Sequence, residues 1–116
     1  MSVMMQLSLW VNVGVLVPVC VALLANRPGA SRVFGDRTAA RGILLSVYLS
    51  ILIVSLALVL MADPRPAAAL LLAQVVYKMT TPFTVGTVKN PVVVSNLAIA
   101  AFHAVTLWRF GWPLGA

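Results

Sequence analysis

The sequence contains no glutamate, and its only acidic residues are Asp36 and Asp63. It also contains a single histidine and a single cysteine. A pair of catalytic carboxylates, a zinc site of cysteine and histidine, and a complete Ser-His-Asp triad therefore have no obvious place in the chain. Cys20 has no second cysteine with which to form an intrachain disulfide. We expect neither an enzyme nor a metal site.

Charged residues of either sign are also scarce. They make up 9% of the 116 residues, whereas hydrophobic residues make up 62% and the mean hydropathy is +1.06. A soluble domain is roughly 45–50% apolar and about 25% charged. A soluble fold of this size could not bury so much apolar surface, so we expect lipid to be the surrounding solvent. The net charge of +6 does not predict a nucleic-acid partner, because the arginines lie between hydrophobic runs.

Four apolar runs have the length of a membrane crossing. They cover residues 7–25, 42–62, 67–85 and 91–108. Each is close to the roughly 20 residues that an α-helix needs to cross a hydrocarbon core of about 30 Å. None alternates as the strands of a membrane barrel do. The predicted fold class is all-α: a polytopic membrane protein with one domain, residues 1–116, whose four transmembrane helices form an antiparallel bundle.

The segments that flank the runs refine this prediction. The last three runs are joined by short connections, so we expect them to form consecutive antiparallel hairpins. Asn90 and Pro91 form a typical helix start, with an N-cap followed by a first-turn proline.

The first run is not expected to be a cleaved signal peptide, because no basic residue precedes it. Leu23 and Leu24 also make a poor cleavage site.

The basic residues predict the orientation of the chain. Four arginines lie in loop 26–41 and Lys89 lies in the last loop, whereas the opposite side has only Arg65 and Arg109. By the positive-inside rule, loop 26–41 is cytoplasmic and both termini are outside, and we expect a bacterial inner membrane. Three tryptophans fit an aromatic belt near the outer edges: Trp10, Trp108 and Trp112. The arginines of the first loop are expected to orient the chain rather than to bind anionic headgroups, which is the alternative.

Small residues repeat every four positions in two of the runs. The first stripe is Gly42, Ser46 and Ser50, and the second is Asn96, Ala100 and Ala104. Helices in lipid approach one another closely through small residues, so we expect both stripes to pack the bundle. Ile51, Leu58 and Leu44, on the opposite face of the second run, are then expected to face lipid or other subunits.

Lys78 is the most unusual residue, because it lies inside the third run with no acidic residue nearby. Polar residues accompany it at helical spacing: Gln74, Tyr77, Thr81 and Thr84. Pro82 removes the amide that would bond the Lys78 carbonyl, so we expect that carbonyl to bind the ammonium or a water. An unpartnered cation near the bilayer centre costs about 2.5–3.5 kcal/mol. Either the side chain extends to headgroups ~10 Å away, or the ammonium binds an anionic group of a ligand, a lipid or a partner chain.

The fourth run supplies polar residues that can face this site. Counted from the shared loop, Asn96 lies level with Thr81 and His103 lies level with Gln74, which predicts one contact for each pair. The candidate site for a ligand or partner is therefore Lys78, Gln74, Tyr77, Thr81, Asn96 and His103. No cofactor is expected. Haem ligation by His103, alone or with the histidine of a second chain, is a less favoured alternative because one histidine cannot supply both axial ligands.

Two functions are compatible with these features. The favoured one is an accessory or structural subunit of a larger membrane complex, in which the polar seam around Lys78 pairs with an anionic group of a partner, lipid or ligand. The alternative is a small homo-oligomeric channel or transporter for an anion or other small solute. The expected partners are membrane lipids together with other membrane subunits or further copies of the chain. The sequence lacks both the membrane-embedded glutamate of small multidrug transporters and the glycine- and phenylalanine-rich signature of fluoride channels.

Overall fold

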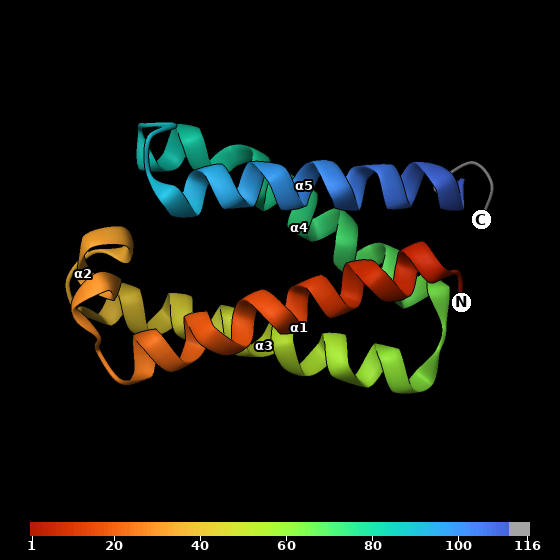
Figure 1. Cartoon of the computed structure of the whole chain (residues 1–116), viewed down its shortest axis with the longest axis horizontal. Helices are drawn as coiled ribbons and strands as arrows, with labels where there is room; N and C mark the ends of the chain where they lie inside the picture. The colour runs from red at the N-terminus through yellow and green to blue at the C-terminus, as the bar shows by residue number, and fades with distance from the viewer. Residues whose placement is uncertain (112–116) are drawn as a thin grey trace.

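A computed structural model describes residues 1–111, which form five α-helices and no strand (Figure 1). The helices are α1 (Val3–Leu24), α2 (Pro28–Phe34), α3 (Ala39–Met61), α4 (Pro64–Val85) and α5 (Pro91–Phe110). All except α2 are long and apolar enough to cross a membrane. The prediction of an all-α membrane protein with four transmembrane helices is therefore confirmed. α5 begins where its apolar run begins, and the other long helices begin a few residues before theirs.

The ends of the long helices follow from local capping chemistry. Four side chains accept a hydrogen bond from a backbone amide of the first turn: Ser2, Thr38, Asp63 and Asn90. The predicted start of α5 at Asn90 and Pro91 is among them, with 2.8 Å between Asn90 Oδ1 and the amide nitrogen of Val92. Gly86 ends α4 with a φ of 86°, a left-handed conformation that glycine adopts without strain.

Helix α2 lies in the loop 26–41, where the sequence predicted no helix. Pro28 occupies its first turn, and Gly35, with a φ of 88°, ends it. The guanidinium of Arg41 holds both ends of α2, because it donates to Asn26 Oδ1 at 2.6 Å and to the Gly35 carbonyl at 3.0 Å. Arg41 is therefore buried, and it is not available to headgroups as the other three loop arginines are.

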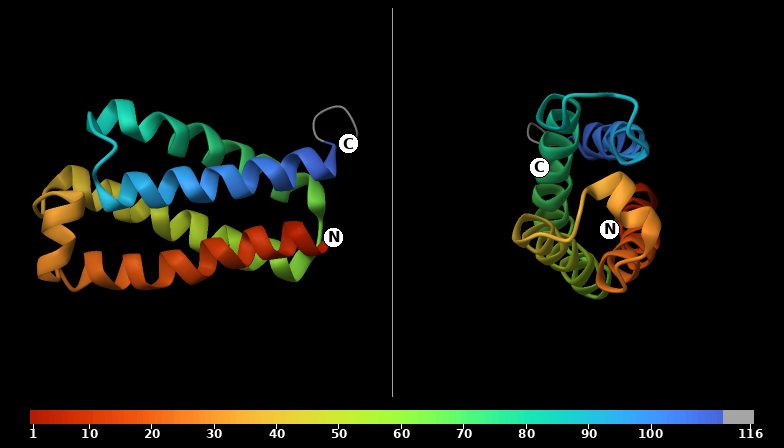
Figure 2. Two further views of the ribbon diagram at one scale, coloured as in Figure 1. Left: turned by 45° about the horizontal axis from the view of Figure 1, so that its top comes forward. Right: turned by 90° about the vertical axis from the view of Figure 1, so that its left-hand side faces the viewer.

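The bundle consists of two helical pairs, α1 with α3 and α4 with α5, which pack most extensively. Contacts between the two pairs are fewer. In particular, the contact between α3 and α4 is much smaller than the contact between α4 and α5. The pairs converge near the termini and diverge toward α2 (Figures 1 and 2). We call these the terminal end and the α2 end. The antiparallel direction of the last three spans agrees with prediction, but only the α4–α5 connection forms a closely packed hairpin.

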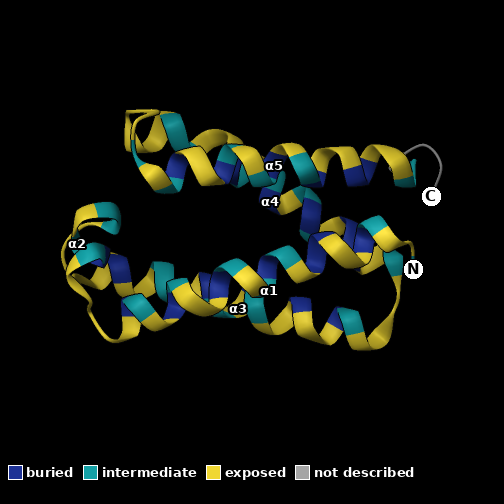
Figure 3. Cartoon of the chain, viewed as in Figure 1, coloured by how far each residue is buried: buried dark blue, intermediate teal, exposed yellow. Residues whose placement is uncertain are grey.

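The buried apolar residues fall into two clusters that differ in which helices they join. The cluster at the terminal end is contributed by all four long helices: Met5, Leu9, Leu58, Ala67, Ala68, Leu71 and Leu107. The cluster toward the α2 end comes from α1, α2 and α3: Leu16, Cys20, Leu23, Ala30, Tyr48 and Ile51. Figure 3 places the buried positions on the facing sides of the helices. The terminal end is consequently closed by the whole bundle, whereas the α4–α5 pair contributes little apolar packing at the α2 end.

The predicted faces of α3 are wrong. Its small stripe of Gly42, Ser46 and Ser50 is exposed on the outside of the bundle, whereas Ile51 and Leu58 are buried. The hydroxyl of Ser50 donates to the Ser46 carbonyl at 2.9 Å, so this polar group is satisfied within its own helix and needs no neighbour.

The stripe of α5 is partly as predicted: Asn96 and Ala100 are buried and Ala104 is exposed. Trp10 and Trp108 are exposed, as an aromatic belt requires. Trp112 lies outside the described residues.

Candidate functional site

A cavity of about 270 Å³ lies between the diverging helical pairs, and all five helices contribute to its wall. Its lining is mostly aliphatic and aromatic: Val15, Leu16, Val19, Val33, Phe34, Tyr48, Tyr77, Pro91 and Val92, with Lys78, Ser95 and Asn96 as further polar members. We call it the Lys78 cavity. Within residues 1–111, Lys78 is the only charged residue in its lining. A mostly apolar wall with a few polar groups is typical of small-molecule sites.

A second space of about 500 Å³ lies nearer the α2 end, and we call it the vestibule. Phe34, Tyr48, Tyr77 and Asn96 line both spaces, so the two adjoin. The vestibule is more polar than the Lys78 cavity. Its further polar lining residues are Ser31, Arg32, Thr81, Thr84 and Asn90. An arginine therefore lies on the route toward Lys78 from the α2 end.

Lys78 is 4% exposed and lies inside the bundle rather than on its outer surface. Its Nζ lies 5.6 Å from the ring centroid of Tyr77, within the range of a cation–π contact. Among residues 1–111, no hydrogen-bond acceptor or carboxylate pairs with this ammonium, since Asp63 caps α4 at the opposite end and Asp36 is exposed in the loop after α2. The ammonium therefore lacks a hydrogen-bonding or ionic partner among these residues and can bind an anion from the cavity.

The Lys78 carbonyl, in contrast, is already satisfied. Pro82 has no amide to offer it, and the Thr81 hydroxyl donates to it at 2.7 Å. The predicted bond from the ammonium to this carbonyl is not formed, because a threonine one turn along the same helix donates to it instead; the alternative, a bound water, stays a prediction. Thr81 also accepts a 3.5 Å hydrogen bond from Asn96 Nδ2, which confirms the predicted contact between α4 and α5.

The predicted hydrogen bond between His103 and Gln74 is not formed. His103 Nε2 instead lies 2.9 Å from Asn12 Oδ1, and Asn12 Nδ2 donates to Ser55 Oγ at 3.1 Å. This chain of bonds joins α5, α1 and α3. The prediction failed because it considered α4 and α5 alone, whereas α1 brings its own buried asparagine against the histidine.

Gln74 lies near these hydrogen bonds but forms none of its own. The Thr81–Asn96 contact sets the register of the antiparallel α4–α5 pair, and seven residues, about two turns, on each helix bring Gln74 opposite His103. Both polar atoms of the Gln74 amide and Nδ1 of His103 are buried with no partner among the described residues. Each such atom costs about 1–3 kcal/mol. A bound water that accepts from the amide nitrogen of Gln74 and donates to Nδ1 of His103 would satisfy two of these three atoms.

The geometry does not fit a haem ligand. His103 is 0% exposed, lines neither the Lys78 cavity nor the vestibule, and uses Nε2 to bond Asn12. Because Asn12 donates to Ser55 through its nitrogen, its oxygen is the acceptor and Nε2 of the neutral imidazole carries the proton.

Beyond His103, toward the terminal end, the bundle is closed. The hydroxyls of Ser8 and Thr106 are 2.7 Å apart and both are buried. Met5, Leu9 and Leu71 are also fully buried at this end. The Lys78 cavity is therefore accessible from the α2 end and separated from the terminal end by packed side chains.

Three of the six predicted site residues line the cavity, namely Lys78, Tyr77 and Asn96, and Thr81 lines the vestibule. Gln74 and His103 lie deeper, toward the terminal end. The sequence analysis missed Phe34 and Tyr48, whose rings pack edge to face with centroids 6.0 Å apart. Tyr48 could have been noticed as the only aromatic residue of its run. Comparison with protein-family models, curated proteins and solved structures finds no match to this chain.

Proposed function

We propose that this chain is a membrane carrier that binds a small organic anion at Lys78. One observation carries the proposal: a buried ammonium with no hydrogen-bonding or ionic partner among residues 1–111 lines a cavity that adjoins the vestibule. An unpaired cation at this depth is costly in the absence of an anion. A bound carboxylate would replace lost hydration with an ion pair and further hydrogen bonds from the uncharged polar lining, of which the Asn96 amide is one.

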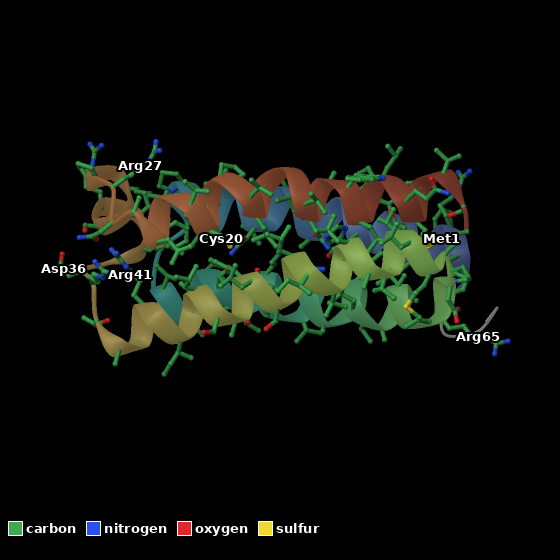
Figure 4. All side chains as sticks on the ribbon, turned by 90° about the horizontal axis from the view of Figure 1, so that it is seen from below. Met1, Cys20, Arg27, Asp36, Arg41 and Arg65 are labelled. Atoms are coloured by element: carbon green, nitrogen blue, oxygen red, sulfur yellow. The ribbon has the colours of Figure 1, made fainter. Side chains whose placement is uncertain are left out.

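The distribution of charge supports entry from the α2 end. Arg27 and Arg41 lie at this end and Arg65 lies at the other (Figure 4). Arg32, in the vestibule lining, would raise the local concentration of anions. By the positive-inside rule we assign this end to the cytoplasm and both termini to the outside, in the inner membrane if the source is a bacterium.

The arrangement of the helical pairs supports a carrier rather than an open channel. The Lys78 cavity is accessible at one end and blocked at the other by side chains such as Leu9 and Leu71, and the contacts between the two pairs are sparse. Rocking of one helical pair against the other about a central site is a common way to alternate access. Movement of the α4–α5 pair against the α1–α3 pair would close the vestibule and open the terminal end.

Uptake into proteoliposomes tests the proposal, with radiolabelled acetate, benzoate and chloride as probes. We expect uptake of acetate or benzoate by the wild type and its loss in Lys78→Met, which keeps side-chain length and removes the charge. Lys78→Arg is expected to retain part of the uptake, and Lys89→Met, in an exposed loop, serves as the matched control. Equal behaviour of Lys78→Met and the wild type toward every probe would refute the proposal.

The second candidate is an accessory subunit of a larger membrane complex. It is favoured by the outer face of α3, where Gly42, Ser46 and Ser50 are exposed at the spacing that lets another helix approach closely. The position of Lys78 inside the bundle favours it less, since a partner's carboxylate would have to enter the cavity. Purification in mild detergent separates the two: co-purifying proteins that are lost in Ser46→Leu support a subunit, and the chain alone or with its own copies supports a carrier.

A further inference from the structure

The wall of the Lys78 cavity restricts the chemistry of the anion. Apart from Lys78, its polar groups are uncharged, and most of its surface is aliphatic or aromatic. Phe34 and Tyr48 present rings with an interplanar angle of 73°. Such rings pack well against another flat ring. One cation can neutralise one negative charge, and a second charge buried in the same space would have no partner.

The size of the cavity sets a second limit. About 270 Å³ is enough for roughly nine groups the size of a water molecule, each with ~30 Å³. A ligand that fills this space has about the same number of non-hydrogen atoms. Acetate would leave most of the apolar wall without contacts, and a long-chain fatty acid would extend beyond this cavity into the vestibule.

We propose that the ligand is an apolar monocarboxylate of the size of benzoate. Its carboxylate binds the Lys78 ammonium and the free hydrogen of the Asn96 amide, which uses its other hydrogen for Thr81. Its apolar body lies toward α2, against Phe34 and Tyr48. This inference rests on the proposed function, since it assumes that Lys78 binds an anion. It adds the size and apolar character of that anion and the number of its charges.

Competition against labelled benzoate tests the inference on the wild-type protein in nanodiscs. Three competitors test the features of the ligand separately. Acetate has the carboxylate without the ring, benzyl alcohol has the ring without the carboxylate, and phthalate has a second carboxylate. We expect each to bind at least about tenfold more weakly than benzoate, a difference that corresponds to about 1.4 kcal/mol.

The outcomes distinguish the two levels of the proposal. If acetate or phthalate competes as well as benzoate and Lys78→Met loses binding, the anion site stands and the inference about its ligand is wrong. If benzoate binds to Lys78→Met as to the wild type, the proposed function itself is wrong. If benzyl alcohol equals benzoate, the carboxylate is not recognised and both fail.

A size variant adds an independent measurement. Val92 lines both the cavity and the vestibule, so Val92→Phe should exclude benzoate while leaving acetate binding unchanged. Val94 lies on the same helix and is 54% exposed, so Val94→Phe is the matched control and should bind benzoate as the wild type does. Circular dichroism checks that both variants are folded. Unchanged benzoate binding by folded Val92→Phe would place the ligand outside the cavity and overturn the inference.

Discussion

His103 in the last helix and Asn12 in the first are joined by a 2.9 Å contact between Nε2 and Oδ1, deep inside the bundle. Because Asn12 also donates to Ser55, one asparagine links three transmembrane helices. Lipid offers no hydrophobic drive between helices, so such bonds help to fix how the two helical pairs are assembled. The same chain of bonds lies between the Lys78 cavity and the closed terminal end.

Asn12→Leu should destabilise the bundle by about 1–3 kcal/mol, because it leaves His103 Nε2 and the Ser55 hydroxyl without their partner. Unfolding in mixed detergent micelles, followed by circular dichroism, measures the change. Ser50→Ala removes an exposed hydroxyl that bonds only within its own helix and should be close to neutral. Equal effects of the two substitutions would show that the buried bonds do not hold the helices together.

The neutral imidazole of His103 should carry its proton on Nε2, with Nδ1 accepting a hydrogen bond from a buried water. Nitrogen-15 NMR of the protein labelled at its single histidine distinguishes the two tautomers by the shifts of the two ring nitrogens. Gln74→Leu should alter the Nδ1 resonance and leave the Nε2 proton in place, because Gln74 lies level with His103 and Nε2 is bonded to Asn12. A proton on Nδ1 would contradict the hydrogen-bond direction derived from Asn12.

Arg41→Gln should release α2 from the end of the bundle. It removes the charged hydrogen bonds to Asn26 and the Gly35 carbonyl, which are worth about 1.5–3 kcal/mol each. Hydrogen exchange should therefore become faster over Pro28–Phe34 and remain unchanged in α5. Arg37→Gln, an exposed position in the same loop, is the control. Protection of α2 that is unaffected by Arg41→Gln would mean that its apolar contacts and the 2.9 Å bond from Asn90 Nδ2 to the Val33 carbonyl are enough to hold it.

Reporter fusions after Arg32 and after α5 should lie on opposite sides of the membrane, with the first in the cytoplasm. The physical cause is the excess of basic residues at the α2 end, so moving several arginines to the other loops should weaken the preference. Activity of both reporters on the same side would contradict the assigned orientation. Substituting Arg32 and Arg37 together should leave retention on anionic vesicles unchanged if these arginines only orient the chain.

The number of spans could be predicted from the sequence, because a run of roughly 20 apolar residues has the length of a helix that crosses a membrane. The Thr81–Asn96 contact could be predicted as well, since a short loop fixes the register of the α4–α5 pair. Local patterns could not say which face of α3 is buried: Gly42 and Ser46 favoured one face, whereas the packing of Ile51 and Leu58 against α1 and α4 selected the other.

The cavity itself could not be predicted from any single stretch. Val33 and Phe34 reach its wall only because α2 folds back over the end of the bundle, where Arg41 bonds both ends of α2 and Asn90 bonds the Val33 carbonyl. Likewise, the partner of His103 lies 91 residues away along the chain. Lys78 was recognisable because a lone cation in an apolar run is costly wherever its neighbours lie.

The chain has two lysines, Lys78 and Lys89, which allows the most direct test of anion binding at Lys78. In Lys89→Arg protein labelled with nitrogen-15 at lysine, the only side-chain ammonium signal in a solid-state NMR spectrum comes from Lys78. With benzoate labelled with carbon-13 at the carboxylate, we expect dipolar coupling between this nitrogen and that carbon, at the ~4 Å separation of an ion pair. Bound benzoate without such coupling would contradict the account.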